Sequence, residues 1–225
     1  MIRLVLFDID GTLVHTHGAG VKAFARAFAT EFNLPSGAEK MSFAGRTDTS
    51  LVREFLRLHQ LEASRECFQR FFDRYVYLLD HYLEHTSGAV IAGVWDWLHQ
   101  LNCLRQPPMI GLLTGNIRLG AEIKLRRFGI WEPFVTGAFA DDHEDRNQIA
   151  GIAYQRGHKL LCGALRPEEV LVVGDTPLDI QCGKAIRAKT LAVATGGAKF
   201  EELQKHPADW VVRNLKDISA TEVCG

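Results

Sequence analysis

The chain alternates short apolar runs with amphipathic helical segments, and this alternation limits the folds that it can adopt. The runs lie at residues 4–7, 109–113, 134–140, 170–174, 189–197 and 209–212. Short continuous runs of large and β-branched apolar residues are typical of strands buried on both faces, as in a parallel sheet covered by helices. We therefore predict an α/β fold with a Rossmann-like, doubly wound parallel sheet.

A helical segment separates the first strand from all the others. Residues 15–85 contain no convincing strand, and three stretches of them carry apolar residues at helical spacing. The residues expected to face inward are Val21, Phe24, Phe28 and Phe32, then Leu51, Phe55 and Leu58, then an aromatic run within 68–82. We predict that residues 15–85 form an inserted all-α cap domain, and that residues 1–14 and 86–225 form the core.

Charge and composition exclude several classes of function. The 225 residues carry a formal net charge of −1, so no basic field is available to bind nucleic acid. No apolar run is long enough to span a membrane, and the N-terminus lacks a signal-peptide pattern. The five cysteines form no C-x-x-C pair, which favours reduced thiols. We expect a cytoplasmic protein that acts on a small molecule, either as a monomer or as a homodimer.

Polar side chains follow three of the predicted strands. Asp8 and Asp10 follow the first strand and point the same way, because side chains alternate along an extended chain. Thr114-Gly115-Asn116 follows the second run, and Asp175 follows the "VLVVG" run, with Asp179 four residues later. A turn alone would explain Asp10-Gly11. Three such ends at one edge of a parallel sheet instead predict a ligand site.

Carboxylates that converge in this way require a positive counter-charge. Oxygen ligands without a histidine or cysteine partner suit a hard cation, most plausibly Mg²⁺. Mg²⁺ commonly bridges to phosphate, which points to a phosphate ester as substrate. The Thr114 hydroxyl and the amides of Gly115 and Asn116 can donate hydrogen bonds to such a group.

Three motifs resemble those of one known family. "DIDGTL", "LLTGN" and "VVGDTPLDI" match its first, second and fourth motifs, in the same order and on strand ends. The chain resembles a haloacid-dehalogenase-superfamily hydrolase of the phosphoglycolate-phosphatase-like branch with a helical cap. The resemblance covers almost the whole chain, the cap included.

The resemblance implies a role for each motif residue. Asp8 would be the nucleophile that forms an aspartyl-phosphate. Asp10 would protonate the leaving oxygen and then help to activate water. Mg²⁺ would be held by Asp8, by the main-chain carbonyl of Asp10 and by Asp175, with Asp179 binding it directly or through water. Thr114 would bind the transferring phosphoryl group.

The third motif departs from the family pattern. The family usually has a lysine before a proline and a helix, whereas this chain has "HEDRNQIAGIA". Arg146 falls where that lysine would be, and Lys159 and Lys124 are competing candidates for the same role. Arginine keeps the charge and can bind phosphate in a bidentate manner, but it does not replace lysine in every respect. An acidic surface loop whose arginine pairs locally remains the structural alternative.

Other features carry less weight. Arg46, in "GRT" at the start of a cap helix, is a candidate substrate-specificity residue, since the family's cap faces the active site. His15 and His17 are interpreted as hinge residues that could touch substrate. "ATGGAKF" at 194–200 is interpreted as a strand-to-helix turn rather than a phosphate loop.

The preferred interpretation is a Mg²⁺-dependent phosphatase of small phosphorylated metabolites. A sugar phosphomutase of the β-phosphoglucomutase type has the same core and a similar cap, and Asp10 is compatible with both. Haloacid dehalogenases resemble the chain but lack the second acid of the first motif, so Asp10 argues against that activity. A non-catalytic binding protein on this scaffold is disfavoured, because the first and fourth motifs are complete.

Overall fold

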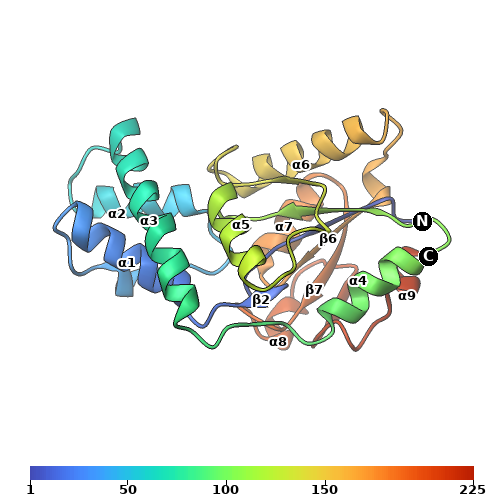
Figure 1. The fold of residues 1–225 in the computed structure, drawn as a ribbon. Coiled ribbons are helices and arrows are strands. Elements are labelled where there is room, and N and C mark those ends of the chain that lie inside the picture. The colour runs from blue at the N-terminus through green and yellow to red at the C-terminus, as the bar shows by residue number, and fades with distance from the viewer.

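The computed structural model describes residues Met1–Gly225, except for the side chain of Glu39. Six parallel strands form one sheet in the order β5-β4-β1-β6-β7-β8 (Figure 1). They are β1 Leu4–Phe7, β4 Met109–Leu113, β5 Thr136–Ala138, β6 Val170–Gly174, β7 Lys189–Val193 and β8 Trp210–Val212. The order reverses at β1, which lies between β4 and β6. This is the doubly wound parallel sheet predicted from the alternation of strands and helices.

Helices cover both faces of this sheet. They are α4 Val94–Cys103, α5 Arg118–Arg127, α6 Arg146–Leu160, α7 Pro177–Ala185, α8 Phe200–Leu203 and α9 Ala220–Cys224. Side chains alternate along β1, so Val5 and Phe7 pack with α4, α5 and α9, whereas Leu4 and Leu6 pack with α6 and α7. β1 is therefore buried on both faces, as its unbroken apolar sequence indicates.

Three helices between β2 and β4 form a separate helical cap with its own core. They are α1 Ala19–Glu31, α2 Asp48–Leu58 and α3 Arg65–Glu84, with a 3₁₀ turn at Ala38–Lys40. Phe24, Phe28 and Phe71 meet in that core, where their rings pack edge-on or tilted. Two inward assignments were wrong: Val21 is 41% exposed and Leu58 is 59% exposed. Val21 borders a cavity between cap and core, and Leu58 ends α2.

A two-stranded antiparallel ribbon joins the cap to the core. It pairs β2 Val14–His15 with β3 Ala89–Val90. The expectation that residues 15–85 contain no strand was wrong only at His15, which belongs to β2, because a two-residue strand is too short to show a periodic pattern. Of the two predicted domain boundaries, the one after residue 14 falls inside β2 and the one after residue 85 falls shortly before β3; both stay a prediction.

Among the described helices, none combines the length and the apolarity that crossing a lipid bilayer requires.

Candidate active site

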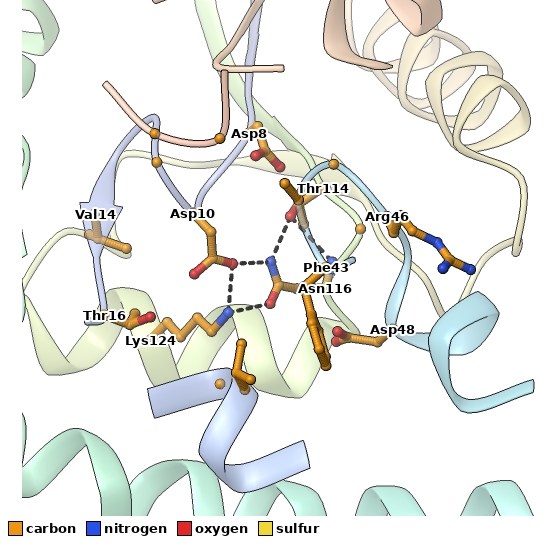
Figure 2. Close-up of a pocket in the computed structure, with 18 of the residues that line it drawn as sticks. Asp8, Asp10, Val14, Thr16, Phe43, Arg46, Asp48, Thr114, Asn116 and Lys124 are labelled. Carbon is orange, nitrogen blue, oxygen red and sulfur yellow. Dashed lines mark hydrogen bonds and ion pairs between the residues drawn. The ribbon is translucent and has the colours of Figure 1, made fainter. Parts of the chain in front are cut away.

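The carboxyl ends of the three central strands place polar residues side by side. Asp8 directly follows β1, Thr114 follows β4 and Asp175 follows β6. All three side chains are buried, and they line one cavity of about 470 Å³ between the core and the cap. Figure 2 shows two of them, Asp8 and Thr114. The structure thus brings together the strand ends that the sequence analysis singled out.

Three carboxylates form the most acidic part of this site. Ligand atoms of Asp8, Asp175 and Asp179 lie within 4.8 Å of one another, and all three residues are buried. Burial raises the pKa of Asp8 to about 6, and the nearby Asp179 and Asp10 add to this effect, while Arg146 opposes it. Burial, together with Asp179 and Asp8, raises the pKa of Asp175 well above its ordinary value. An all-oxygen donor set with this need for positive charge fits a hard divalent cation.

The backbone around Asp175 is shaped to receive its carboxylate. Thr12 Oγ1 donates a hydrogen bond to Asp175 Oδ1 at 3.3 Å, and the Gly197 amide donates one to Oδ2. Gly11 has a φ of 78°, and a Cβ at Gly11 would collide with the Asp175 carboxylate and the Gly196 backbone. The Gly196-Gly197 turn therefore does more than connect β7 to α8, since it lines the cavity and helps to orient Asp175.

Arg146 faces the acidic cluster from the start of α6. Its Nη2 lies 2.9 Å from Asp8 Oδ1 and 2.5 Å from Asp179 Oδ1, while Nη1 donates to the Gly45 carbonyl of the cap at 3.1 Å. Although burial acts to lower the pKa of Arg146, Asp179 and Asp8 raise it well above its ordinary value. Asp145 caps this helix by accepting from the Asn147 amide at 2.7 Å. The third-motif position thus has the charge and the reach to contact a phosphoryl group on Asp8.

Lys124 lies in the same cavity but contacts a different acid. From α5 its buried Nζ donates to Asp10 Oδ2 and to Asn116 Oδ1, both at 2.6 Å (Figure 2). The Asn116 side chain also donates to Asp10 Oδ2 at 2.9 Å and to Thr114 Oγ1 at 2.9 Å. Because Thr114 Oγ1 accepts here, its own proton is free to point to a ligand. Lys159 is exposed and lines a separate cavity, away from Asp8.

A segment of the cap closes the cavity over these residues. The Asp48 amide donates to the Gly115 carbonyl at 2.7 Å, and Asp48 Oδ2 accepts from the Ile117 amide at 2.9 Å. Arg46 borders the cavity, but its guanidinium points away from Asp8 and Asp10 (Figure 2). It forms an ion pair with Glu54 at 2.6 Å. Arg46, the candidate specificity residue predicted from the sequence, therefore points away from the cavity. Asp48 lies on the cavity wall but was not predicted, because its only signal was its place in the first turn of a helix.

The site therefore has two ends. One end holds Asp8, Asp175, Asp179 and Arg146, whose charges suit a cation and a phosphoryl group. The other end offers Asp10, paired with Lys124, and opens toward the cap. An acid two residues after a candidate nucleophile can transfer protons to a leaving group that lies on the cap side.

Comparisons with known proteins found similar sequences and similar folds. Residues 5–193 match the profile of a family described as haloacid dehalogenase-like hydrolase. The pyrophosphatase PpaX of Oceanobacillus iheyensis is 28% identical over 220 residues, covering 96% of this chain and 95% of the relative. The PpaX of Bacillus cereus is 26% identical, with 96% and 94% covered.

Solved structures share the fold. A HAD hydrolase of family IA, variant 3, from Entamoeba histolytica aligns with a TM-score of 0.76 at 16% identity, covering 100% of this chain and 98% of that one. A "predicted phosphoglycolate phosphatase" from Haemophilus somnus aligns with a TM-score of 0.72 at 20% identity, covering 96% of each chain. At these identities the likeness establishes the architecture of core and cap.

Proposed function

This chain belongs to the haloacid dehalogenase-like hydrolases, and on that basis we propose that it is a Mg²⁺-dependent phosphatase of small phosphorylated metabolites. It would act through an aspartyl-phosphate, as in the phosphoglycolate-phosphatase-like branch. The observation that carries the proposal is the position of Asp8, which lies 2.9 Å from Arg146 and within 4.8 Å of two further buried carboxylates.

The acidic cluster fits the cation. Asp8, Asp175, Asp179 and the main-chain carbonyl of Asp10 would hold Mg²⁺, which, when bound, neutralises the carboxylates and the phosphate oxygens so that like charges can approach. The chain's own residues supply the remaining contacts. Arg146 binds a phosphate oxygen beside Asp8, and the Thr114 hydroxyl donates to another.

The reaction divides into two displacements at phosphorus. An Asp8 carboxylate oxygen attacks phosphorus, the bond from phosphorus to the ester oxygen breaks, and Asp10 gives its proton to the departing oxygen. In the second displacement Asp10 takes a proton from water, the water oxygen attacks phosphorus, and the bond from phosphorus to Asp8 breaks. Phosphate leaves and Asp8 is regenerated as a carboxylate.

A sugar phosphomutase of the β-phosphoglucomutase type is the second candidate. It is supported by Asp10 together with a cavity that lies between the core and the cap, since both reactions need an acid–base group and shelter from bulk water. The two reactions differ in the fate of the phosphoryl group, which a mutase returns to the sugar.

The test is a panel of phosphorylated metabolites assayed for phosphate release with and without Mg²⁺. We expect release from at least one small ester that stops in EDTA and returns with Mg²⁺. Asp8→Asn should abolish it, because an amide cannot attack phosphorus. Isomerisation of a phosphosugar without phosphate release would favour the mutase, and full activity in EDTA would rule out the proposed chemistry.

A further inference from the structure

Asp48 is an acid on the cavity wall that the proposed reaction does not use. It begins α2 in the cap, and its Oδ2 accepts a hydrogen bond from the Ile117 amide at 2.9 Å. Among the described residues, no lysine, arginine or histidine forms an ion pair with it. A partly buried carboxylate without a cationic partner is costly to maintain, and such groups cluster at functional sites.

The charges around Asp48 do not balance at this end of the cavity. Asp10 and Asp48 are two carboxylates that line the cavity, and the Lys124 ammonium, which lines it too, is already bonded to Asp10 and Asn116. Burial raises the pKa of Asp48 to about 6, and Lys124 only partly opposes this rise. Because a pKa of about 6 still lies below neutral pH, the group is mainly an anion there. Arg46 adds no charge here because its guanidinium pairs with Glu54. Two exposed histidines, His15 and His17, also line the cavity.

A hydroxyl group and open space lie beside these acids. Tyr75 is buried on α3, lines the cavity, and has no hydrogen-bond partner for its hydroxyl among the described residues. Burial, with Asp48 and Asp10, raises its pKa well above the ordinary value, so it remains a neutral hydroxyl. A Cβ at Gly20 would lie 3.6 Å from Lys124 Nζ and 3.7 Å from the Tyr75 hydroxyl, so a glycine there leaves both groups open to the cavity.

We propose that Asp48 accepts a hydrogen bond from the substrate's leaving group, so that the site selects phosphate esters whose leaving group carries a hydroxyl or ammonium donor. Leaving groups with a second negative charge are disfavoured, because they would meet the two carboxylates of Asp48 and Asp10 on the cavity wall. The inference rests on the proposed phosphatase function. Phosphoglycolate and pyrophosphate both fall in the disfavoured class, which would separate this chain from the pyrophosphatases that it resembles in sequence.

The test compares the wild-type protein with Asp48→Asn, whose amide oxygen can still accept from Ile117 but carries no charge. We would measure kcat/KM with Mg²⁺ for glycerol 3-phosphate and phosphoethanolamine, and for phosphoglycolate and pyrophosphate. Each value is divided by that for phenyl phosphate, which reports the chemistry at Asp8. Wild type should prefer the first pair, and Asp48→Asn should shrink that preference by about tenfold or more, the change expected for one charge-assisted contact. Glycerol 3-phosphate and phosphoethanolamine separate a neutral donor from a cationic one.

Asp80→Asn is the matched control, since Asp80 is an exposed acid of α3 that does not line the cavity and its replacement removes the same charge from the cap. It should leave the ratios unchanged. If Asp48→Asn does not fold, as judged by circular dichroism, Asp48→Ser serves the same comparison.

The two proposals fail in different ways. A wild-type protein that releases phosphate but prefers phosphoglycolate or pyrophosphate overturns the role of Asp48 and leaves the phosphatase standing. Ratios that are equal in wild type and Asp48→Asn do the same. A wild-type protein that releases phosphate from none of the esters, phenyl phosphate included, overturns the phosphatase function and, with it, the role of Asp48.

Discussion

At the scale of single residues, Arg146 shows why a guanidinium differs from an ammonium at the third motif. One side chain reaches Asp8 and Asp179 through Nη2 and the Gly45 carbonyl of the cap through Nη1. A planar fork can span acceptors on two sides, whereas a lysine presents a single point of charge on a flexible chain. Arg146 therefore links the candidate nucleophile to the closed cap.

We predict that Arg146→Ala lowers kcat/KM by about ten- to a hundredfold without unfolding the protein, because a charge-assisted contact of this kind contributes about 1.5–3 kcal/mol. Arg146→Lys should recover part of the loss, since its ammonium can pair with Asp8 but cannot also hold Gly45. Lys159→Ala is the control and should change little. Near-normal kinetics for Arg146→Ala, beside a large loss for Lys124→Ala or Lys159→Ala, would assign the role to that lysine.

Asp48 also makes stability depend on pH. The folded protein keeps the Asp48 proton up to a pKa of about 6, whereas the unfolded chain releases it near 3.8. Between these values the folded state binds more protons, so this group lowers the free energy of unfolding as pH rises through the window. The full effect is at most about 3 kcal/mol.

Asp48→Asn should therefore gain stability relative to wild type as pH rises from 4 to 7, measured by urea unfolding in EDTA. A difference between the two proteins that stays constant with pH would contradict the burial of a charged Asp48.

At the scale of secondary-structure elements, the segment that leads into α2 attaches the cap to the core. Thr47 Oγ1 accepts from the Ser50 amide at 3.2 Å, which caps α2, and donates to the Glu144 carbonyl of the core at 2.8 Å. Ser64 caps α3 in the same way, accepting from the Cys67 amide at 3.3 Å. No contact from the Ser64 side chain to the core is found among the described residues.

The N-cap residues Thr47 and Ser64 allow the stability of a helix to be tested separately from the docking of the helical cap onto the core. Thr47→Ala and Ser64→Ala should each cost about 1 kcal/mol of stability through loss of an N-cap. Only Thr47→Ala should also lower kcat/KM, because it alone loosens the cap over the cavity. The assays should run at a temperature at which thermal-shift measurements show both variants to be folded. Equal effects of the two variants on kcat/KM would then show that docking through Thr47 is not needed for turnover.

The elements differ in how far the sequence predicts them. Strand ends such as Asp8 and Asp175 were predictable, because an apolar run that stops at an acid marks both the strand and its edge. The β2–β3 ribbon, the exposure of Val21 and the contacts of Lys124 were not. They depend on contacts between segments that are distant in the sequence, such as Lys124 of α5 with Asp10, or Asp48 of the cap with Ile117. No local sequence pattern predicts such contacts.

At the scale of the whole molecule, the site gathers more negative charge than its own cations neutralise. Asp8 and Asp175 both have raised pKa values, chiefly because they are buried and lie near other acids. Folding without a cation is therefore penalised, and a ligand that binds only the folded state adds stability by mass action.

We predict that Mg²⁺ raises the Tm of the wild-type protein in a concentration-dependent manner. Asp175→Ala should need more Mg²⁺ for the same shift and for activity, because a ligand is lost. Differential scanning fluorimetry across a Mg²⁺ series measures this, with Asp80→Asn as the control. An identical Mg²⁺ response in Asp175→Ala and wild type would place the cation elsewhere.

The central claim is that Asp8 forms a covalent aspartyl-phosphate. The direct measurement uses Asp10→Asn, which should accumulate the intermediate from an aryl phosphate, because an aryl leaving group needs little protonation while hydrolysis still needs a base. After rapid quenching and borohydride reduction, mass spectrometry should find homoserine in place of Asp8, and the Asp8→Asn/Asp10→Asn double variant should show none. The account would be contradicted if the wild-type protein hydrolyses the aryl phosphate while the quenched Asp10→Asn samples show no homoserine at position 8. Homoserine in place of a different acid would contradict it as well.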